Sequence, residues 1–205
     1  MVMHTTSPVV SRRAPVRPSP EQIDAAILDT AAEVFARHGF AGTSVQQVAD
    51  AVGYSKTGLL RRFPSKQALY DAAVEHVTTE VRALRGRLEG QGPARRRGFL
   101  ASAAAAAFAR PGVVLLMIEA LQEGADLPHA DRLDALAHDL LAALTEDLAE
   151  PHDRLRAVMA LQLVANTALL TLEPQAPLGD LPPAQVQELA VEAAVAVLGA
   201  GPAPA

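Results

Sequence analysis

The sequence predicts an all-α protein of about nine helices, and three observations support this fold class. Alanine and leucine dominate the 205 residues, whereas aromatic residues make up 3% and tryptophan is absent. Sheets usually pack through aromatic and β-branched side chains, so this composition favours helix packed on helix. Apolar residues recur every three or four positions between glycine and proline breaks, and no alternation typical of a strand appears.

Composition also narrows the functional classes. The chain has no cysteine, which excludes disulfide frameworks, cysteine metal sites and thiol catalysis. No apolar run reaches the roughly 18 residues that a membrane-spanning helix needs. The N-terminal arginines precede no apolar segment of the kind found in signal peptides. We therefore expect a cytoplasmic protein without a membrane partner.

The breaks divide the chain into an arm, a small N-terminal domain and a larger C-terminal domain. Residues 1–20 contain four prolines and show no periodicity, which predicts a disordered arm. Residues 21–66 are expected to form a compact three-helix unit. Residues 67–200 are expected to form a second helical domain, followed by a short tail at residues 201–205.

Four helices are expected within the first 90 residues. The first ends at Gly39, because glycine readily adopts the left-handed conformation that closes a helix. The second ends at Gly53, and Ser55 caps a third helix that Pro64 terminates. The fourth is long and ends near Gly90.

Five further helical segments follow. They are expected at residues 94–109, 113–123, 131–150, 153–172 and 184–198. The segment 153–172 is apolar nearly all round, which is typical of a helix with more than one buried face. Either this helix lies inside its own domain or it also contacts a second copy of the chain.

The second and third helices have the anatomy of a helix-turn-helix motif. Each is about two turns long, and the tetrapeptide at residues 52–55 joins them through a glycine. In such motifs the second helix lies in the major groove of DNA. Its outer face would offer Lys56, Thr57, Leu60 and Arg61. Long cations suit guanine edges and phosphates, while Thr57 and Leu60 can contact thymine methyl groups.

Charge is distributed unevenly along the chain. The net charge is −5, yet residues 1–66 hold 8 basic and 5 acidic side chains, against 10 and 18 in the remainder. No acidic residue interrupts residues 51–70, which contain both lysines of the chain. A basic patch on an acidic protein is typical of a nucleic-acid reader. A solvated basic helix face remains the alternative from charge alone.

The segment TSVQQVADAVGYSKTGLLRRFPSKQALY, at residues 43–70, resembles the DNA-binding domain of the TetR family of bacterial transcriptional regulators. The resemblance extends over residues 23–77, roughly a quarter of the chain, and is specific because many positions agree in spacing. The matching positions are Gly39, Phe40, Thr43, Ser44, Val48, Ala49, Gly53, Ser55, Lys56, Leu59, Phe63, Ser65, Lys66 and Leu69.

This resemblance implies a set of DNA contacts. Thr43 and Ser44 are expected to bind a phosphate through hydroxyl groups and helix-terminal amides. The third helix would face base edges and the nearby backbone, and Lys66 would bind a phosphate near the fourth helix. The predicted DNA-binding residues are Thr43, Ser44, Gln46, Lys56, Thr57, Gly58, Leu60, Arg61, Arg62 and Lys66.

The chain departs from the family pattern at two positions. Leu60 stands where the family usually has a tyrosine that hydrogen-bonds the DNA backbone. Arg62 stands where the family often has histidine or tyrosine. One phosphate hydrogen bond is lost and one cation is gained, so no operator sequence can be transferred from a relative.

Two features allow alternative interpretations. Gly58 costs about 1 kcal/mol relative to alanine inside a helix, and it either permits a close approach to DNA or reflects neutral drift at an exposed site. Arg12, Arg13 and Arg17 either enter a minor groove, as basic arms do, or belong to a solvated tail.

The resemblance also implies a dimer. A helix-turn-helix monomer buries too little surface to bind one site tightly, so two-fold pairing on a palindromic operator is usual. In the family the last two helices form a four-helix interface with those of the second copy. The residues predicted for this homodimer interface are Val164, Ala168, Val186, Leu189, Ala193 and Val197.

The middle helices are expected, by the same resemblance, to enclose a small-molecule effector. Gln162 and Asn166 share a helix face with apolar residues, and buried amides need partners. Those partners are either polar groups of a ligand or groups across the dimer or on the backbone. The scarcity of aromatic residues favours an aliphatic or compact ligand. The residues predicted for ligand binding are Phe99, Phe108, Met117, Leu121, Met159, Gln162 and Asn166.

Taken together, the sequence predicts a DNA-binding repressor that a largely apolar effector releases from its operator. A DNA-binding protein without an effector is the alternative, and a helical enzyme is disfavoured. A helical metal carboxylate site needs paired Glu-x-x-His motifs, whereas Asp126 and His129 are unpaired and Pro128 interrupts them. No catalytic residue, metal or cofactor is expected.

Overall fold

The computed structural model describes residues 19–88, 92–121, 128–146, 148, 150–173, 178 and 180–199. These residues form nine α-helices and no strand, which confirms the predicted all-α fold. The helices are α1 (Pro20–Gly42), α2 (Val45–Val52), α3 (Lys56–Arg62), α4 (Lys66–Gly86), α5 (Gly92–Ala109), α6 (Pro111–Ala120), α7 (Ala130–Thr145), α8 (Pro151–Leu170) and α9 (Pro183–Gly199). The arginines Arg12, Arg13 and Arg17, Asp126 and residues 201–205 lie outside the described residues.

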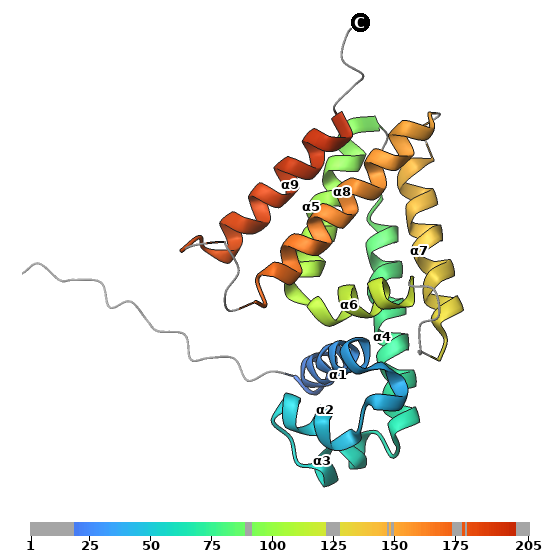
Figure 1. Ribbon diagram of the computed structural model, residues 1–205, viewed down its shortest axis with the longest axis vertical. Helices are drawn as coiled ribbons and strands as arrows, with labels where there is room; N and C mark the ends of the chain where they lie inside the picture. The colour runs from blue at the N-terminus through green and yellow to red at the C-terminus, as the bar shows by residue number, and fades with distance from the viewer. Residues whose placement is uncertain are drawn as a thin grey trace, which may run out of the picture.

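The helices α1, α2 and α3 form a small bundle at one end of the molecule (Figure 1). Helix α4 starts beside this bundle and runs on into the larger group of helices. Its first half packs on α1, where the rings of Phe35 and Tyr70 meet edge to face with centroids 4.9 Å apart. Helix α4 therefore belongs to the cores of both parts of the chain.

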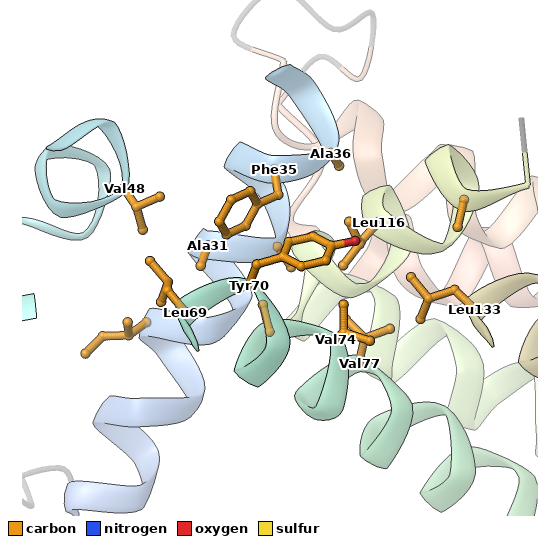
Figure 2. Close-up of a cluster of buried hydrophobic side chains, with 14 of the residues drawn as sticks. Ala31, Phe35, Ala36, Val48, Leu69, Tyr70, Val74, Val77, Leu116 and Leu133 are labelled. Carbon is orange, nitrogen blue, oxygen red and sulfur yellow. The ribbon is translucent and has the colours of Figure 1, made fainter. Parts of the chain in front are cut away.

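One buried cluster joins the N-terminal bundle to the C-terminal helices. Figure 2 shows Leu116 of α6 and Leu133 of α7 beside Val77 of α4, and all three side chains are fully buried. The Tyr70 hydroxyl also donates a hydrogen bond of 2.5 Å to the Pro128 carbonyl, just before α7. Helices α6 and α7 therefore pack directly on α4.

Helix α6 begins against the backbone of α1. A Cβ atom at Gly112 would lie only 2.0 Å from the Asp29 carbonyl oxygen, so glycine is required for this close approach. The Asp29 carboxylate accepts a hydrogen bond of 3.3 Å from the Val113 amide. Negative charge is favoured at a helix N-terminus, which makes Asp29 a suitable partner for the first turn of α6.

The helices α5, α8 and α9 pack together through small side chains. Their shared buried residues are Leu100, Ala104, Ala107, Ala160, Val164, Ala168, Val191 and Ala194. The distance between packed helix axes depends on the side chains at the contact, and alanine allows a close approach. This packing explains why the C-terminal part needs few aromatic residues.

Some helix boundaries differ from the prediction. Helix α4 ends at Gly86, before the predicted end near Gly90, and α5 begins at Gly92, before the predicted start at residue 94. Gly92 has a φ of 69°, which is the left-handed region that favours glycine. Helix α6 begins at Pro111, because proline lacks an amide that the first turn of a helix leaves unpaired.

Within the described residues, no single helix has the length and apolar composition needed to cross a membrane. The pair formed by α5 and α6 meets that criterion only when both are counted together, and the chain bends by 103° between them.

Candidate nucleic-acid interface

Side-chain caps define both short helices of the reading head, by which we mean α2, α3 and the turn between them. The Ser44 hydroxyl accepts a hydrogen bond from the Gln47 amide, and the Gln47 side chain accepts one from the Ser44 amide. Ser55 caps α3 by accepting the Gly58 amide at 3.0 Å. Gly53 closes α2 with a φ of 76°. The start and end of each helix are therefore encoded locally.

Helix α3 has one buried and one exposed face. Leu59 is fully buried in the core that α2 shares. Lys56, Thr57 and Arg61 are exposed, and Leu60 is half buried. Residues spaced in this way share one side of a helix. Within the described part of the chain, neither Lys56 nor Arg61 has an acidic partner, so both cations are available to an anionic ligand.

Gly58 has a local structural role beside the side chain that caps α3. A Cβ atom there would lie 3.0 Å from the Ser55 hydroxyl oxygen and 3.8 Å from Tyr54 Cδ1. The first distance is shorter than ordinary van der Waals contact, so a larger residue would press on the cap of α3. The glycine therefore leaves the Ser55 cap unstrained.

The structure gives Thr43 a role inside the protein. Its side chain is 3% exposed, and its hydroxyl donates to the Gly39 carbonyl at 2.8 Å, at the end of α1. The hydroxyl proton is thus used within the chain, and the phosphate contact of Thr43 stays a prediction. Ser44 and Gln46 are exposed, and the Gln46 amide donates to the Asp50 carboxylate at 2.6 Å. Their contacts with DNA stay predictions.

Two of the predicted DNA-binding cations are directed toward α1. Lys66 Nζ donates to the Phe40 carbonyl at 2.9 Å and lies 4.4 Å from the centroid of the Phe40 ring. Arg62 forms an ion pair with Asp24. Positive charge is favoured at a helix C-terminus, so Lys66 stabilises the end of α1. Arg62, at the end of α3, holds the reading head onto α1, and Lys66 joins the start of α4 to the end of α1. Both cations are engaged inside the protein, and their contacts with DNA phosphates stay predictions.

A cavity of about 430 Å³ lies among α4, α5, α6, α7 and α8. It falls within the range of about 300–1,000 Å³ that is typical of small-molecule sites. Of its 20 lining residues, 17 are apolar, and the three polar ones are His138, Gln162 and Asn166. Its walls include Val81 and Leu84, from the half of α4 beyond the reading head. The sequence analysis did not place these two residues in a ligand site. They could have been found from the apolar positions of the fourth helix, which continue beyond the part that packs on α1.

The cavity includes four of the seven residues predicted for ligand binding. These are Met117, Leu121, Gln162 and Asn166. Phe99 is instead fully buried beside Leu144, and Phe108 packs on the α5–α8–α9 core. Met159 is half exposed and does not line the cavity. These three residues therefore do not line this cavity, and their role in ligand binding stays a prediction.

The predicted dimer residues fall on two different sides of their helices. Val164, Ala168 and Val186 are buried, Val197 is half buried, and Leu189 and Ala193 are exposed. A side chain buried inside its own chain cannot reach a second copy. The prediction is therefore corrected for the three buried residues, whereas the others stay predictions.

Titratable groups gather where α1, α4 and α6 meet. Burial raises the pKa of Asp29 to about 6, although hydrogen bonds from the first amides of α6 oppose this shift. Arg110 Nη1 lies 2.5 Å from Glu80 Oε2. Burial also lowers the pKa of His76, whose Nε2 atom has no hydrogen-bond partner among the described residues. This junction connects the reading head with the walls of the cavity.

The geometry defines a class of protein: a helix-turn-helix unit with an exposed basic face, joined to a larger helical domain that contains a cavity. Comparison with known proteins gives the family. Residues 27–73 match the bacterial regulatory proteins of the tetR family. The HTH-type transcriptional regulator RutR of Escherichia coli K12 is 48% identical over 52 residues, which are 25% of this chain and 24% of RutR. The match thus spans about a quarter of the curated relative.

Solved structures extend the likeness, at the level of the fold, to most of the chain. AmtR of Mycobacterium smegmatis is 26% identical, with a TM-score of 0.54 over 93% of this chain and 91% of AmtR. SCO3833 of Streptomyces coelicolor A3, a member of the TetR transcriptional regulator family, is 20% identical, with a TM-score of 0.58 over 89% and 92%. The N-terminal part of the chain thus matches the TetR family of transcriptional regulators, and the fold of the chain is similar to that of solved TetR-family structures.

Proposed function

We propose that this protein is a repressor that binds a palindromic operator as a homodimer, with α3 in the major groove. The observation that carries this proposal is the exposed face formed by Lys56, Thr57 and Arg61 on a helix that Ser55 caps. Arginine can donate two hydrogen bonds to the edge of a guanine. Ser44, at the start of α2, would donate its hydroxyl to a phosphate.

The proposed dimer forms through the outer faces of α8 and α9. Leu155 and Met159 of α8 are 60% and 50% exposed, and Leu189 of α9 is 47% exposed. Ala193 lies one helical turn beyond Leu189 and is also exposed. Apolar side chains that gather on one surface are typical of interfaces. A second copy is the proposed occupant, since two reading heads are needed to read a palindrome.

The proposed effector site is the cavity, and its position suggests how a ligand would release DNA. Its walls include α4 and α6, and both of these helices contact α1. A ligand that moved α4 or α6 would change the separation of the two reading heads. That separation must match half-sites about 34–36 Å apart. Effector and operator would then weaken each other's binding by the same factor.

The test is a fluorescence-anisotropy titration with DNA that flanks the protein's own gene, against a scrambled duplex, at two salt concentrations. We expect a preference of roughly a thousandfold that weakens steeply with salt. Equal and weak binding to both duplexes would contradict an operator in that region. The absence of binding even at low salt would contradict the assignment of α3 as a DNA-reading helix.

A pair of variants tests the role of α3. Arg61→Ala should reduce the preference for the operator by about 1–3 kcal/mol, because a base contact is lost. Arg37→Ala is the matched control, since this exposed arginine of α1 pairs with Glu33 in its own helix at 3.1 Å. Equal losses in the two variants would contradict base reading by Arg61. Such a regulator would act in the cytoplasm, as the sequence predicts, and would not be an enzyme.

A further inference from the structure

The buried wall of the cavity is aliphatic. Val81, Ala107 and Val164 line it and are nearly inaccessible to solvent. Among the described residues that line it there is no phenylalanine, tyrosine, lysine, arginine, aspartate or glutamate. An ionised group held in such a wall would lose its hydration without gaining a counterion. A flat aromatic ligand would find no ring to stack on. The interior thus suits a neutral hydrocarbon body.

The polar lining residues are all exposed, so they lie at the opening of the cavity. His138 is on α7, and Gln162 and Asn166 are one turn apart on α8. The side chain of His138 is 69% exposed. A ligand with its hydrocarbon part inside would therefore place a polar group between α7 and α8.

The hydrogen bonding of His138 indicates which polar group fits. Its Nδ1 atom lies 2.9 Å from the Asp134 carbonyl oxygen and 3.3 Å from Asp134 Oδ1, and both oxygens accept hydrogen bonds. The proton of a neutral imidazole is therefore on Nδ1, and Nε2 is left as an acceptor. Nε2 has no partner within the described part of the chain. A ligand that donates a hydrogen bond satisfies Nε2, whereas an ether, an ester or an ionised carboxylate does not.

We propose that the cavity binds a neutral aliphatic alcohol, with its hydrocarbon part inside and its hydroxyl at the opening, where it donates to His138 Nε2. Gln162 and Asn166 also line the cavity, and their side-chain amides are hydrogen-bond donors. This proposal rests on the cavity being the effector site of the proposed repressor, and it adds the chemical class of the effector.

The test uses linear probes that differ only in their polar group. Binding of decan-1-ol, decyl methyl ether and decanoate is measured at pH 8 by calorimetry and by the shift of the thermal midpoint, without DNA. We expect decan-1-ol to bind about tenfold more tightly than either of the other probes, because only the alcohol satisfies Nε2 without burying a charge. Equal or tighter binding of the ether or of decanoate would overturn the proposal. So would the failure of every linear alcohol from hexan-1-ol to dodecan-1-ol.

A matched pair of variants assigns the contact to His138. His138→Phe should abolish the preference for the alcohol over the ether while leaving binding of the ether unchanged. His152→Phe is the control, because His152 is an exposed histidine of α8 that does not line the cavity. A preference that survives in His138→Phe would overturn the assignment. Operator binding, measured separately, keeps the two proposals distinct, since a protein that binds DNA but no alcohol contradicts only the ligand class.

Discussion

The reading head and the cavity are built by opposite means. In the reading head, individual side chains fix each short helix: Ser44 and Ser55 cap it, Gly53 ends it and Leu59 packs beneath it. The cavity is instead enclosed mainly by aliphatic residues from five helices. A binding surface of the first kind leaves a local pattern in the sequence. One of the second kind depends on how distant helices are arranged.

The largest expected effect comes from truncating one leucine in each region, which compares how tightly the reading head and the cavity wall are packed. Leu59→Ala should lower the free energy of unfolding by about 2–5 kcal/mol, because a fully buried side chain is lost. Leu84→Ala should cost less, because Leu84 already borders open volume. Urea unfolding of both variants measures the difference. Equal losses would show that the cavity wall is packed as tightly as the reading head.

A smaller effect separates structural from DNA-binding cations. Lys66→Ala should lower the free energy of unfolding by about 1–2 kcal/mol, because the Phe40 carbonyl loses its charged donor and the Phe40 ring loses its cation. Lys56→Ala should leave stability unchanged and reduce the slope of log K against log salt by about one, as expected for one lost phosphate contact. The reverse outcome would restore Lys66 as a phosphate contact.

The junction between the two regions should respond to pH. The pKa of Asp29 is raised to about 6 from 3.8, because burial disfavours its ionised form. The unfolded chain therefore releases this proton at a lower pH than the folded chain does, and stability falls as pH rises from about 4 to 6. Asp29→Asn should remove the contribution of Asp29 to this loss of stability between pH 4 and 6. That contribution is on the order of 1 kcal/mol after allowance for solvent screening. Urea titrations at pH 4, 5, 6 and 7 measure it, and parallel curves for the two proteins would contradict the shift.

The sequence could predict the reading head because its information is local. The hydroxyl caps, the glycine of the turn and the alternation of buried and exposed positions lie within twenty residues. It could not predict that Lys66 donates to the Phe40 carbonyl of α1, because that carbonyl is 26 residues away along the chain. The same limit applies to Val164. Its spacing placed it correctly on an apolar face of α8, but that face is covered by helices of its own chain.

The substitution Gly58→Ala should have the smallest effect on stability. It also separates two roles of the glycine, which are to leave room for the Ser55 cap and to allow a close approach to DNA. Alanine is favoured over glycine in a helix by about 1 kcal/mol, but a Cβ atom 3.0 Å from the Ser55 hydroxyl oxygen would strain a cap of similar value. The two effects should nearly cancel in the free energy of unfolding of Gly58→Ala. Operator affinity should nevertheless fall, because the added methyl group lies on α3, the helix proposed to enter the groove. Unchanged affinity would show that the glycine serves only the cap, whereas a clear gain in stability would show that the cap tolerates a larger residue.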